Sequence, residues 1–148
     1  MVMDGVVFRE LGRFCDERGW LVEIFRNDQT SYRPVMSYVS MTKPGVARGP
    51  HEHIEQTDLF CFFGNFRLSL WDNRIESATY GKKVVFDCGE KPHMAVVPPG
   101  VVHAYQNIGQ TDALVINLPD RLFRGEGKAS PVDEVRHEND PDSPYKVE

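Results

Sequence analysis

Several features that would assign this chain to a broad class are missing from its 148 residues. No apolar run approaches the roughly 18 residues that a membrane span needs, so we expect no membrane partner. The N-terminus lacks a charged segment followed by an apolar stretch, which argues against a signal peptide. The net charge of -5 argues against a broad nucleic-acid-binding surface. There are no internal repeats or low-complexity tracts.

Cysteine is also scarce. Cys15, Cys61 and Cys88 are an odd and widely scattered set. This spacing favours reduced thiols over a disulfide framework or a zinc cluster. Together with the missing signal peptide, it predicts a cytoplasmic protein.

What the chain does contain is a series of short β patterns. The length predicts one domain over residues 1–148, with N-terminal arm strands in 1–30 and a C-terminal lid or tail in 119–148. About nine apolar segments separated by turn residues predict an all-β sandwich or barrel. The segment 51–63 reads as one strand, and Gly64-Asn65 predicts a hairpin to the strand that follows.

Two histidines stand at the start of that long apolar segment. His51 and His53 are two residues apart, and alternating side chains on a strand would turn both imidazoles towards one interior. A second piece, Pro98-Pro99-Gly100-Val101-Val102-His103 with Asn107, follows about fifty residues later. With Gly45 and Gly64, these pieces resemble the paired motifs of the cupin superfamily, which implies a double-stranded β-helix, or jelly-roll, barrel.

More of the chain is similar to the dTDP-4-dehydrorhamnose 3,5-epimerase family of nucleotide-sugar enzymes. The similar pieces follow the family's order and cover most of the chain: 16–23 (Asp-Glu-Arg-Gly-Trp-Leu-Val-Glu), 45–51 (Gly-Val-Ala-Arg-Gly-Pro-His), 71–74 with Ser77 and 79–81, 97–105, and 139–141 (Asn-Asp-Pro). The resemblance implies an epimerase or isomerase of sugar or polysaccharide biosynthesis that requires no cofactor.

The resemblance also implies roles for individual residues. His51, after the Arg-Gly-Pro piece, becomes the catalytic base, and Asp140 becomes the carboxylate that orients it. Substrate binding would then fall to a further set of residues: Arg18, Glu23, Arg48, His103 and Tyr105. In this family the segment with Arg18 and Glu23 commonly reaches the partner subunit's site, so we expect a homodimer with exchanged N-terminal strands.

The implied chemistry suits these residue types. The C3 and C5 protons of a dTDP-4-keto-6-deoxyhexose are acidified by the neighbouring C4 carbonyl. A neutral imidazole can remove one of them near physiological pH. The enolate that forms needs a positive charge or hydrogen-bond donors aimed at its O4 oxygen.

The chain departs from the family at three points. Asp58 stands where the family has a lysine, His53 where those epimerases usually carry another residue, and no tyrosine occurs in 114–123. Epimerisation at one carbon, ketoisomerisation and loss of activity are therefore all open.

The same departures favour two alternatives. His51, His53, Asp58 and His103 match the positions that hold a metal in metal-binding cupins, and this donor set suits Zn²⁺, Mn²⁺, Fe²⁺ or Ni²⁺. A metal-dependent cupin enzyme acting on another small substrate is the first alternative. A sugar-binding cupin without catalysis is the second.

The tail has two interpretations of its own. Composition alone indicates a surface segment, with a helical turn or two over 130–136 capped by Ser130. The family resemblance instead makes it a lid that carries a catalytic carboxylate.

Overall fold

The structure, a computed structural model, describes residues 2–148 and is almost entirely β, as the sequence predicts. Short 3₁₀ helices, η1 and η2, occur only near the C-terminus of the described chain. The elements are β1 (Val7–Glu10), β2 (Arg13–Asp16), β3 (Gly19–Val22), β4 (Tyr38–Thr42), β5 (Ala47–Glu52), β6 (Asp58–Phe63), β7 (Phe66–Asp72), β8 (Lys83–Asp87), β9 (His93–Val97), β10 (Val101–Asn107), β11 (Ala113–Asn117), η1 (Glu126–Lys128), β12 (Val135–Arg136) and η2 (His137–Asn139). Across residues 2–148, no helix is long and apolar enough to span a membrane.

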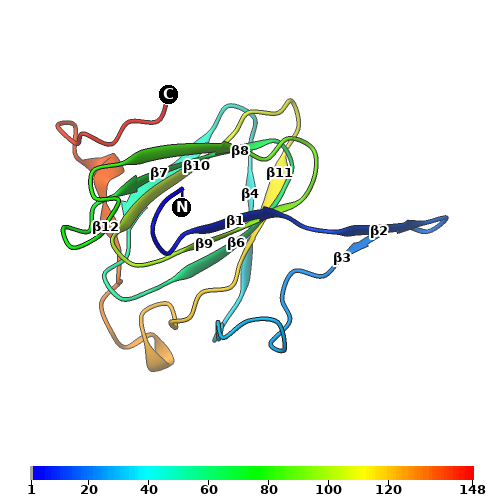
Figure 1. The fold of residues 1–148 in the computed structure, drawn as a ribbon, viewed down its shortest axis with the longest axis horizontal. Coiled ribbons are helices and arrows are strands. Elements are labelled where there is room, and N and C mark those ends of the chain that lie inside the picture. The colour runs from blue at the N-terminus through cyan, green and yellow to red at the C-terminus, as the bar shows by residue number, and fades with distance from the viewer. Residues whose placement is uncertain (1) are drawn as a thin grey trace.

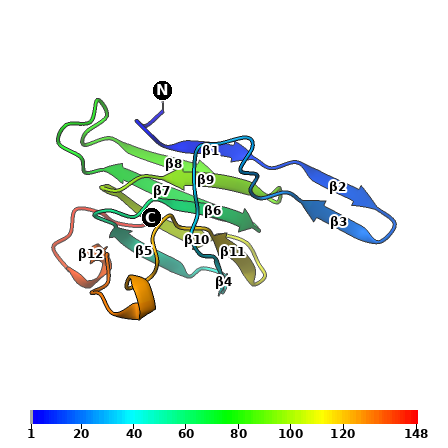
Figure 2. The ribbon, with the colours of Figure 1, turned by 90° about the horizontal axis from the view of Figure 1, so that it is seen from below.

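Two antiparallel five-stranded sheets form the body of the molecule (Figures 1 and 2). One has the order β1-β9-β6-β11-β4 and the other β12-β5-β10-β7-β8. Strands that neighbour one another in a sheet are mostly distant in sequence, as in a jelly roll. This connectivity brings β5 and β10, which carry the candidate histidines, side by side.

Two local expectations about strand pairing are wrong. The segment 51–63 is not one strand, because β5 ends at Glu52 in one sheet and β6 begins at Asp58 in the other. The turn at Gly64 is real, but β6 and β7 lie in different sheets and form no hairpin. Gly64 has φ +138, and a Cβ there would lie 2.5 Å from Ala113 Cβ, so this crossing between sheets needs glycine.

The N-terminal arm divides into two parts. β1 pairs with β9 and is an edge strand of the body. β2 and β3 form a separate two-stranded ribbon that projects away from it (Figures 1 and 2). An isolated hairpin is only marginally stable in water, so this ribbon needs a surface to pack against.

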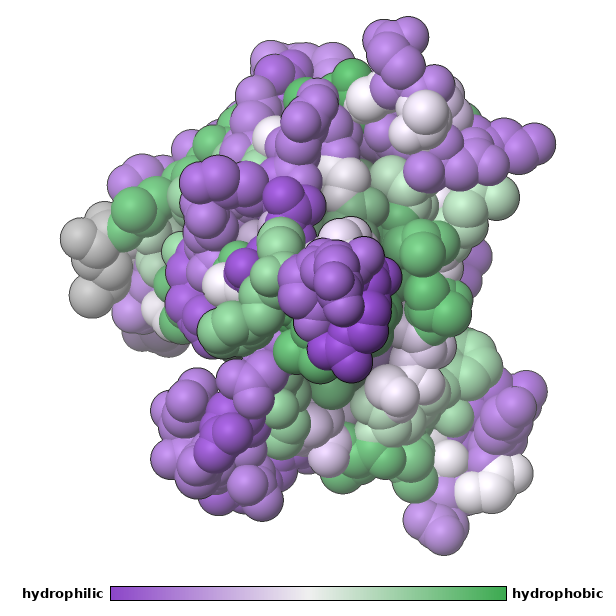
Figure 3. All heavy atoms as spheres, turned by 90° about the vertical axis from the view of Figure 1, so that its right-hand side faces the viewer, coloured by the Kyte–Doolittle hydropathy of each residue, from purple (hydrophilic) through white to green (hydrophobic). Residues whose placement is uncertain are grey.

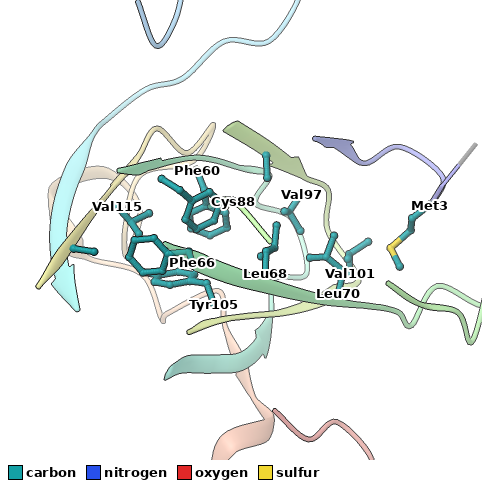
Figure 4. Close-up of a cluster of buried hydrophobic side chains, with 13 residues drawn as sticks. Met3, Phe60, Phe66, Leu68, Leu70, Cys88, Val97, Val101, Tyr105 and Val115 are labelled. Carbon is teal, nitrogen blue, oxygen red and sulfur yellow. The ribbon is translucent and has the colours of Figure 1, made fainter. Parts of the chain in front are cut away.

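The main core lies between the two sheets. Phe60 and Phe62 from β6 meet Phe66 from β7 and Tyr105 from β10, with ring centroids 5.4 to 5.8 Å apart. Leu68, Val97 and Val115 extend this cluster along the barrel (Figure 4). The aromatic end of the core therefore supports the strands that carry the histidines.

The C-terminal tail does not form the helical turn expected over 130–136. Val135 and Arg136 form strand β12, which pairs with β5 at the edge of its sheet. Ser130 is no helix cap, because the nearest 3₁₀ turns, η1 and η2, have Gly125 and Arg136 at their N-cap positions. The free backbone groups of the β5 edge offered a competing partner, and pairing with them outweighed local helix propensity.

A buried carboxylate stabilises the turn that follows β7. Asp72, at the end of β7, accepts hydrogen bonds from Arg74 Nε (2.8 Å), Ser77 Oγ (2.6 Å) and Thr79 Oγ1 (2.6 Å). Burial alone would raise the pKa of Asp72, but these hydrogen bonds lower it below its ordinary range. The folded state therefore favours the ionised form.

We expect Asp72→Asn to destabilise the fold by about 2–4 kcal/mol at pH 7, because it removes the charge from a buried, fully hydrogen-bonded group. A lowered folded pKa gives stability that is present above the ordinary carboxylate pKa of about 4 and is lost as the pH falls below it. Urea unfolding at pH 7 and pH 3 should thus show the gap between wild type and variant narrowing in acid. Asp87→Asn, which breaks the exposed Arg67 pair, is the control and should change stability far less. An equal effect of both substitutions would contradict this account.

Candidate functional site

A cavity of about 1180 Å³ opens between β5, β10 and the C-terminal tail. It is large enough for a nucleotide-sized ligand. Its lining includes His51, His53, Arg48 and Tyr105, and it combines aromatic, basic and acidic side chains. Residues from the tail, including 121–125 and 130–134, form much of its other wall.

His51 and His53, which the sequence predicts to face one interior, lie close together, and His103 joins them. His103 on β10 lies opposite His51 on β5, and the two ring centroids are 4.5 Å apart. One ring nitrogen from each of His51, His53 and His103 can be chosen so that all three lie within 4.8 Å of one another. Gly49 permits this close approach of β5 to β10, since a Cβ there would lie 2.5 Å from the His103 carbonyl oxygen.

His53 lies just after β5 and is held between two acceptors. Its Nδ1 contacts the carbonyl oxygen of Asp133, and its Nε2 lies 3.1 Å from Asp58 Oδ2. Burial alone would lower the pKa of His53, but the hydrogen bonds and charges of Asp58 and Asp133 raise it to about 9. Oxygen acceptors at both nitrogens favour the doubly protonated, cationic form of His53 at neutral pH, and Gln56 Nε2 also lies 3.2 Å from its Nε2.

Asp58 is the carboxylate that pairs with His53. Its side chain is 1% exposed at the start of β6. Burial would raise the pKa of this carboxyl, but the hydrogen bond from His53 and the nearby charges, with a hydrogen bond from Asn117, lower it to about 2. Gln56 Nε2 and Asn117 Nδ2 each donate to Asp58 Oδ1 at 2.8 Å.

His51 is in the opposite situation. Burial is the main cause that lowers the pKa of His51 to about 2, and the neighbouring imidazoles of His103 and His53 oppose its protonation further, so its imidazole is neutral at physiological pH. Glu134 Oε1 lies 3.6 Å from its Nε2, and Glu138 Oε1 lies 3.9 Å from its Nδ1. Both distances exceed a hydrogen bond, so the one unprotonated ring nitrogen of neutral His51 is free to accept a proton.

His103 lies behind the other two rings and does not line the cavity. Its Nδ1 donates to the Val101 carbonyl at 3.0 Å, which leaves a lone pair on Nε2. That Nε2 is buried without a hydrogen-bond partner among the described residues, 3.4 Å from Asp58 Oδ2. Burial lowers the pKa of His103, so it too is neutral. The family resemblance implies that His103 contacts substrate directly. Because His103 does not line the cavity, it is better placed to support the other two histidines.

The other expected substrate-binding residues fall into two groups. Arg48 lines the cavity and donates to Thr42 Oγ1 (3.0 Å) and the Met41 carbonyl (2.8 Å). Tyr105 also lines it, with its hydroxyl 3.4 Å from Ser40 Oγ. Arg18 and Glu23 do not line it. Arg18 is at the ribbon tip and pairs with Asp16, and Glu23 follows the ribbon and pairs with Arg26.

Asp140 does not reach His51 in this structure. The ion-pair contacts of His51 within residues 2–148 come from Glu134 and Glu138. The Asp140 carboxylate is exposed and accepts the backbone N–H of Asp142 at 2.9 Å. Its position after η2, beyond the strand that pairs with β5, explains why it points elsewhere.

Sequence reasoning missed several residues at this site. Asp133, Glu134 and Glu138 surround the histidines, and Arg121, Arg124 and Lys128 add positive charge to the cavity wall. The acidic pair Asp133-Glu134 just after Pro131 was the available signal, but the pairing partner of that segment could not be identified from composition.

Comparison with known proteins identifies a matching family model and related proteins. The family model described as dTDP-4-dehydrorhamnose 3,5-epimerase matches residues 1–129. The chain is 41% identical over 123 residues to the probable low-salt glycan biosynthesis epimerase Agl13 of Haloferax volcanii, covering 80% of this chain and 79% of that protein. It is 33% identical over 118 residues to the spore coat polysaccharide biosynthesis protein SpsL of Bacillus subtilis, covering 78% of each.

A solved structure agrees on the fold. The dTDP sugar isomerase from Desulfovibrio desulfuricans G20 superimposes with a TM-score of 0.81 at 24% identity, covering 97% of this chain and 91% of that one. The matched family region ends before β12 begins.

Proposed function

The chain belongs to the dTDP-4-dehydrorhamnose 3,5-epimerase family and is an enzyme of the nucleotide-sugar epimerase and isomerase class, and from this premise we propose its reaction. It removes a proton next to the C4 ketone of a dTDP-4-keto-6-deoxyhexose, with His51 as the base. The observation that carries the proposal is the pair of imidazoles in the cavity lining: His53 is held between Asp58 and Asp133, whereas the carboxylates nearest to His51 lie beyond hydrogen-bond distance.

His51 has the properties that a base requires. It is neutral, it lines the cavity and it has no hydrogen bond to break before it accepts a proton. The C3–H or C5–H bond of the sugar breaks, its proton goes to an imidazole nitrogen, and the electron pair moves to O4 as an enolate.

His53 supplies the positive charge for that enolate. This role falls to a lysine in the family, and the chain has Asp58 at that position. Asp58 cannot replace the lysine, because it is an anion. Its Oδ2 lies 3.1 Å from His53 Nε2 and keeps His53 protonated, so the positive charge is carried by His53 instead. Two side chains whose surroundings shift their pKa values in opposite directions are suited to act as base and acid.

The remaining groups suit the nucleotide part of the substrate. Arg48, Arg121, Arg124, Lys128 and Arg136 line the cavity. Guanidinium groups bind phosphate oxygens in paired, directional hydrogen bonds. A diphosphate accommodated here would leave the sugar beside the histidines. The cytoplasmic location expected from the sequence stays a prediction.

We expect the wild-type protein to exchange at least one carbon-bound proton of a dTDP-4-keto-6-deoxyhexose with D₂O, followed by proton NMR. His51→Asn should slow this exchange by the roughly 10²- to 10⁴-fold typical of general-base catalysis. Exchange at one carbon rather than two is expected, because no tyrosine lies in 114–123 to serve the second position.

His93→Asn is the matched control, since His93 lies on β9 outside the cavity lining. Wild-type protein that binds the nucleotide sugar without any exchange would instead support the sugar-binding alternative. Exchange that survives in His51→Asn would show that the base is another residue.

We also propose that the enzyme is a homodimer. The projecting ribbon exposes Phe14, Trp20 and Leu21 at 63%, 56% and 60%. Figure 3, seen from the ribbon end, shows hydrophobic surface around a hydrophilic tip. The exposed apolar residues of β4 and β11, Val39, Met41 and Leu114, offer a surface for a partner's ribbon. Arg18 and Glu23 would then reach the partner's cavity.

Light scattering at micromolar concentration should give a dimer mass. Leu21→Asp should shift it towards monomer without unfolding the body, because Leu21 is on the ribbon. The same variant should weaken nucleotide-sugar binding if the ribbon completes the partner's site. A wild-type monomer at this concentration would defeat the proposal.

A metal-dependent enzyme is the second candidate, and the geometry of four side chains favours it. Asp58 Oδ2 lies 3.1 Å from His53 Nε2 and 3.4 Å from His103 Nε2. Those separations match the edges of a coordination shell with bonds of about 2.1 Å. The hydrogen bonds at Nδ1 of His53 and His103 would leave both Nε2 atoms available, and His51 would be the further ligand. A bound divalent ion would act as a Lewis acid towards an oxygen atom of another small substrate, as the sequence alternative expects.

In that case, purified protein should carry near-stoichiometric transition metal, and His53→Ala should lose most of it while His93→Ala keeps it. Elemental analysis together with thermal unfolding in added Zn²⁺, Mn²⁺, Fe²⁺ or Ni²⁺ measures both binding and stabilisation. Absence of metal and of any stabilisation would eliminate this candidate.

A further inference from the structure

The last nineteen residues lie outside the region matched by the family model, yet residues 130–134, Arg136 and Glu138 of this segment line the cavity. β12 pairs with the edge of β5, with Val135 opposite Glu52 and Arg136 opposite His51 (Figure 2). Side chains directly opposite each other in antiparallel strands share a face of the sheet. Glu134, two positions from Arg136, is therefore directed to the face that carries His51.

The contacts agree with this register. Glu134 Oε1 is 3.6 Å from His51 Nε2, and Glu134 Oε2 accepts a hydrogen bond from Arg136 Nε at 2.8 Å. Glu138 is farther from the ring, at 3.9 Å, and its side chain is 30% exposed against 14% for Glu134. Of the two, Glu134 is the closer, the more buried and the one held from a second side.

The segment that carries Glu134 is fixed on both sides. Before it, the Asp133 carboxylate accepts the backbone N–H groups of residues 54–56 at 2.8 to 2.9 Å. After it, His137 Nε2 lies 2.9 Å from Glu52 Oε1, and Asn73 donates to the same oxygen at 2.9 Å. These contacts hold the tail against β5 and restrict where the Glu134 carboxylate can lie.

We propose that Glu134 is the positioning carboxylate of the base His51, in the place that the Asn-Asp-Pro resemblance assigns to Asp140. This inference rests on the proposed function. Glu134 Oε1 accepts the Nε2–H proton of neutral His51 and leaves the lone pair on Nδ1. Nδ1 takes the proton from carbon, and the carboxylate stabilises the imidazolium that forms. At 3.6 Å the Glu134 carboxylate already favours the Nε2–H tautomer in the resting enzyme, and the separation closes to a hydrogen bond when substrate fills the cavity, as catalytic contacts commonly tighten on binding.

The test compares four variants of the tail in the D₂O exchange assay. Glu134→Gln keeps the shape and removes the charge, and it should lower kcat by about 10- to 100-fold, the usual cost of losing a carboxylate that supports a histidine. KM should change little, because the lost contact acts on the base. Glu134→Asp should recover part of the rate. Asp140→Asn tests the competing assignment, and Asp142→Asn, an exposed carboxylate with no side-chain contact among those described, is the control.

A second readout does not depend on turnover. In ¹⁵N NMR of the resting enzyme, His51 should be the Nε2–H tautomer in wild type and in Asp142→Asn, and this preference should weaken in Glu134→Gln. An Nδ1–H tautomer in wild type would overturn the inference, even if Glu134→Gln cannot be folded.

The outcomes distinguish a failure of the proposed function from a failure of the role assigned to Glu134. Wild type without exchange would remove the proposed function, and the tautomer alone would then decide whether Glu134 holds His51. Wild type with exchange, together with unchanged kcat in Glu134→Gln or a large loss confined to Asp140→Asn, would overturn the inference and leave the proposed function intact.

Discussion

The buried carboxylate of Asp58 is the constraint on which the rest of the site depends. Its side chain is 1% exposed, and an isolated charge at such a place is strongly unfavourable. His53, Gln56 and Asn117 satisfy it from the end of β5, from the loop and from β11. Both sheets of the barrel are thus tied to one anion, and the position of His53 is determined by that tie.

This arrangement decides the charge of each histidine. The Asp58 anion keeps His53 protonated, and the Asp133 carbonyl occupies its other nitrogen. The resulting positive charge helps to keep His51 neutral, together with burial. A lysine and a tyrosine are not the only way to provide a donor beside a base. In the proposed mechanism, a histidine cation held by a buried aspartate provides the positive charge in a chain that has neither residue at the family's positions.

Much of this could be predicted from the sequence, and the failures have definite physical causes. Short apolar segments separated by turn residues predicted the strands, and the two-residue spacing of His51 and His53 predicted their shared interior. The turn residues at Gly64 indicate that the chain reverses, but they do not indicate which sheet the next strand joins. The predicted hairpin was therefore wrong. The roles of Asp133 and Glu134 depend on contacts with residues about eighty positions earlier. No local pattern encodes such a pairing, and local composition instead favoured a helical turn.

The central claim is that His53 is a cation and His51 a neutral base in the resting enzyme. Long-range ¹H–¹⁵N correlation NMR at pH 7, with assignments from His51→Asn and His53→Asn, measures this directly. The account predicts that His53 shows two protonated nitrogens while His51 and His103 each show one. Neutral His53, or a protonated His51, at that pH would contradict it.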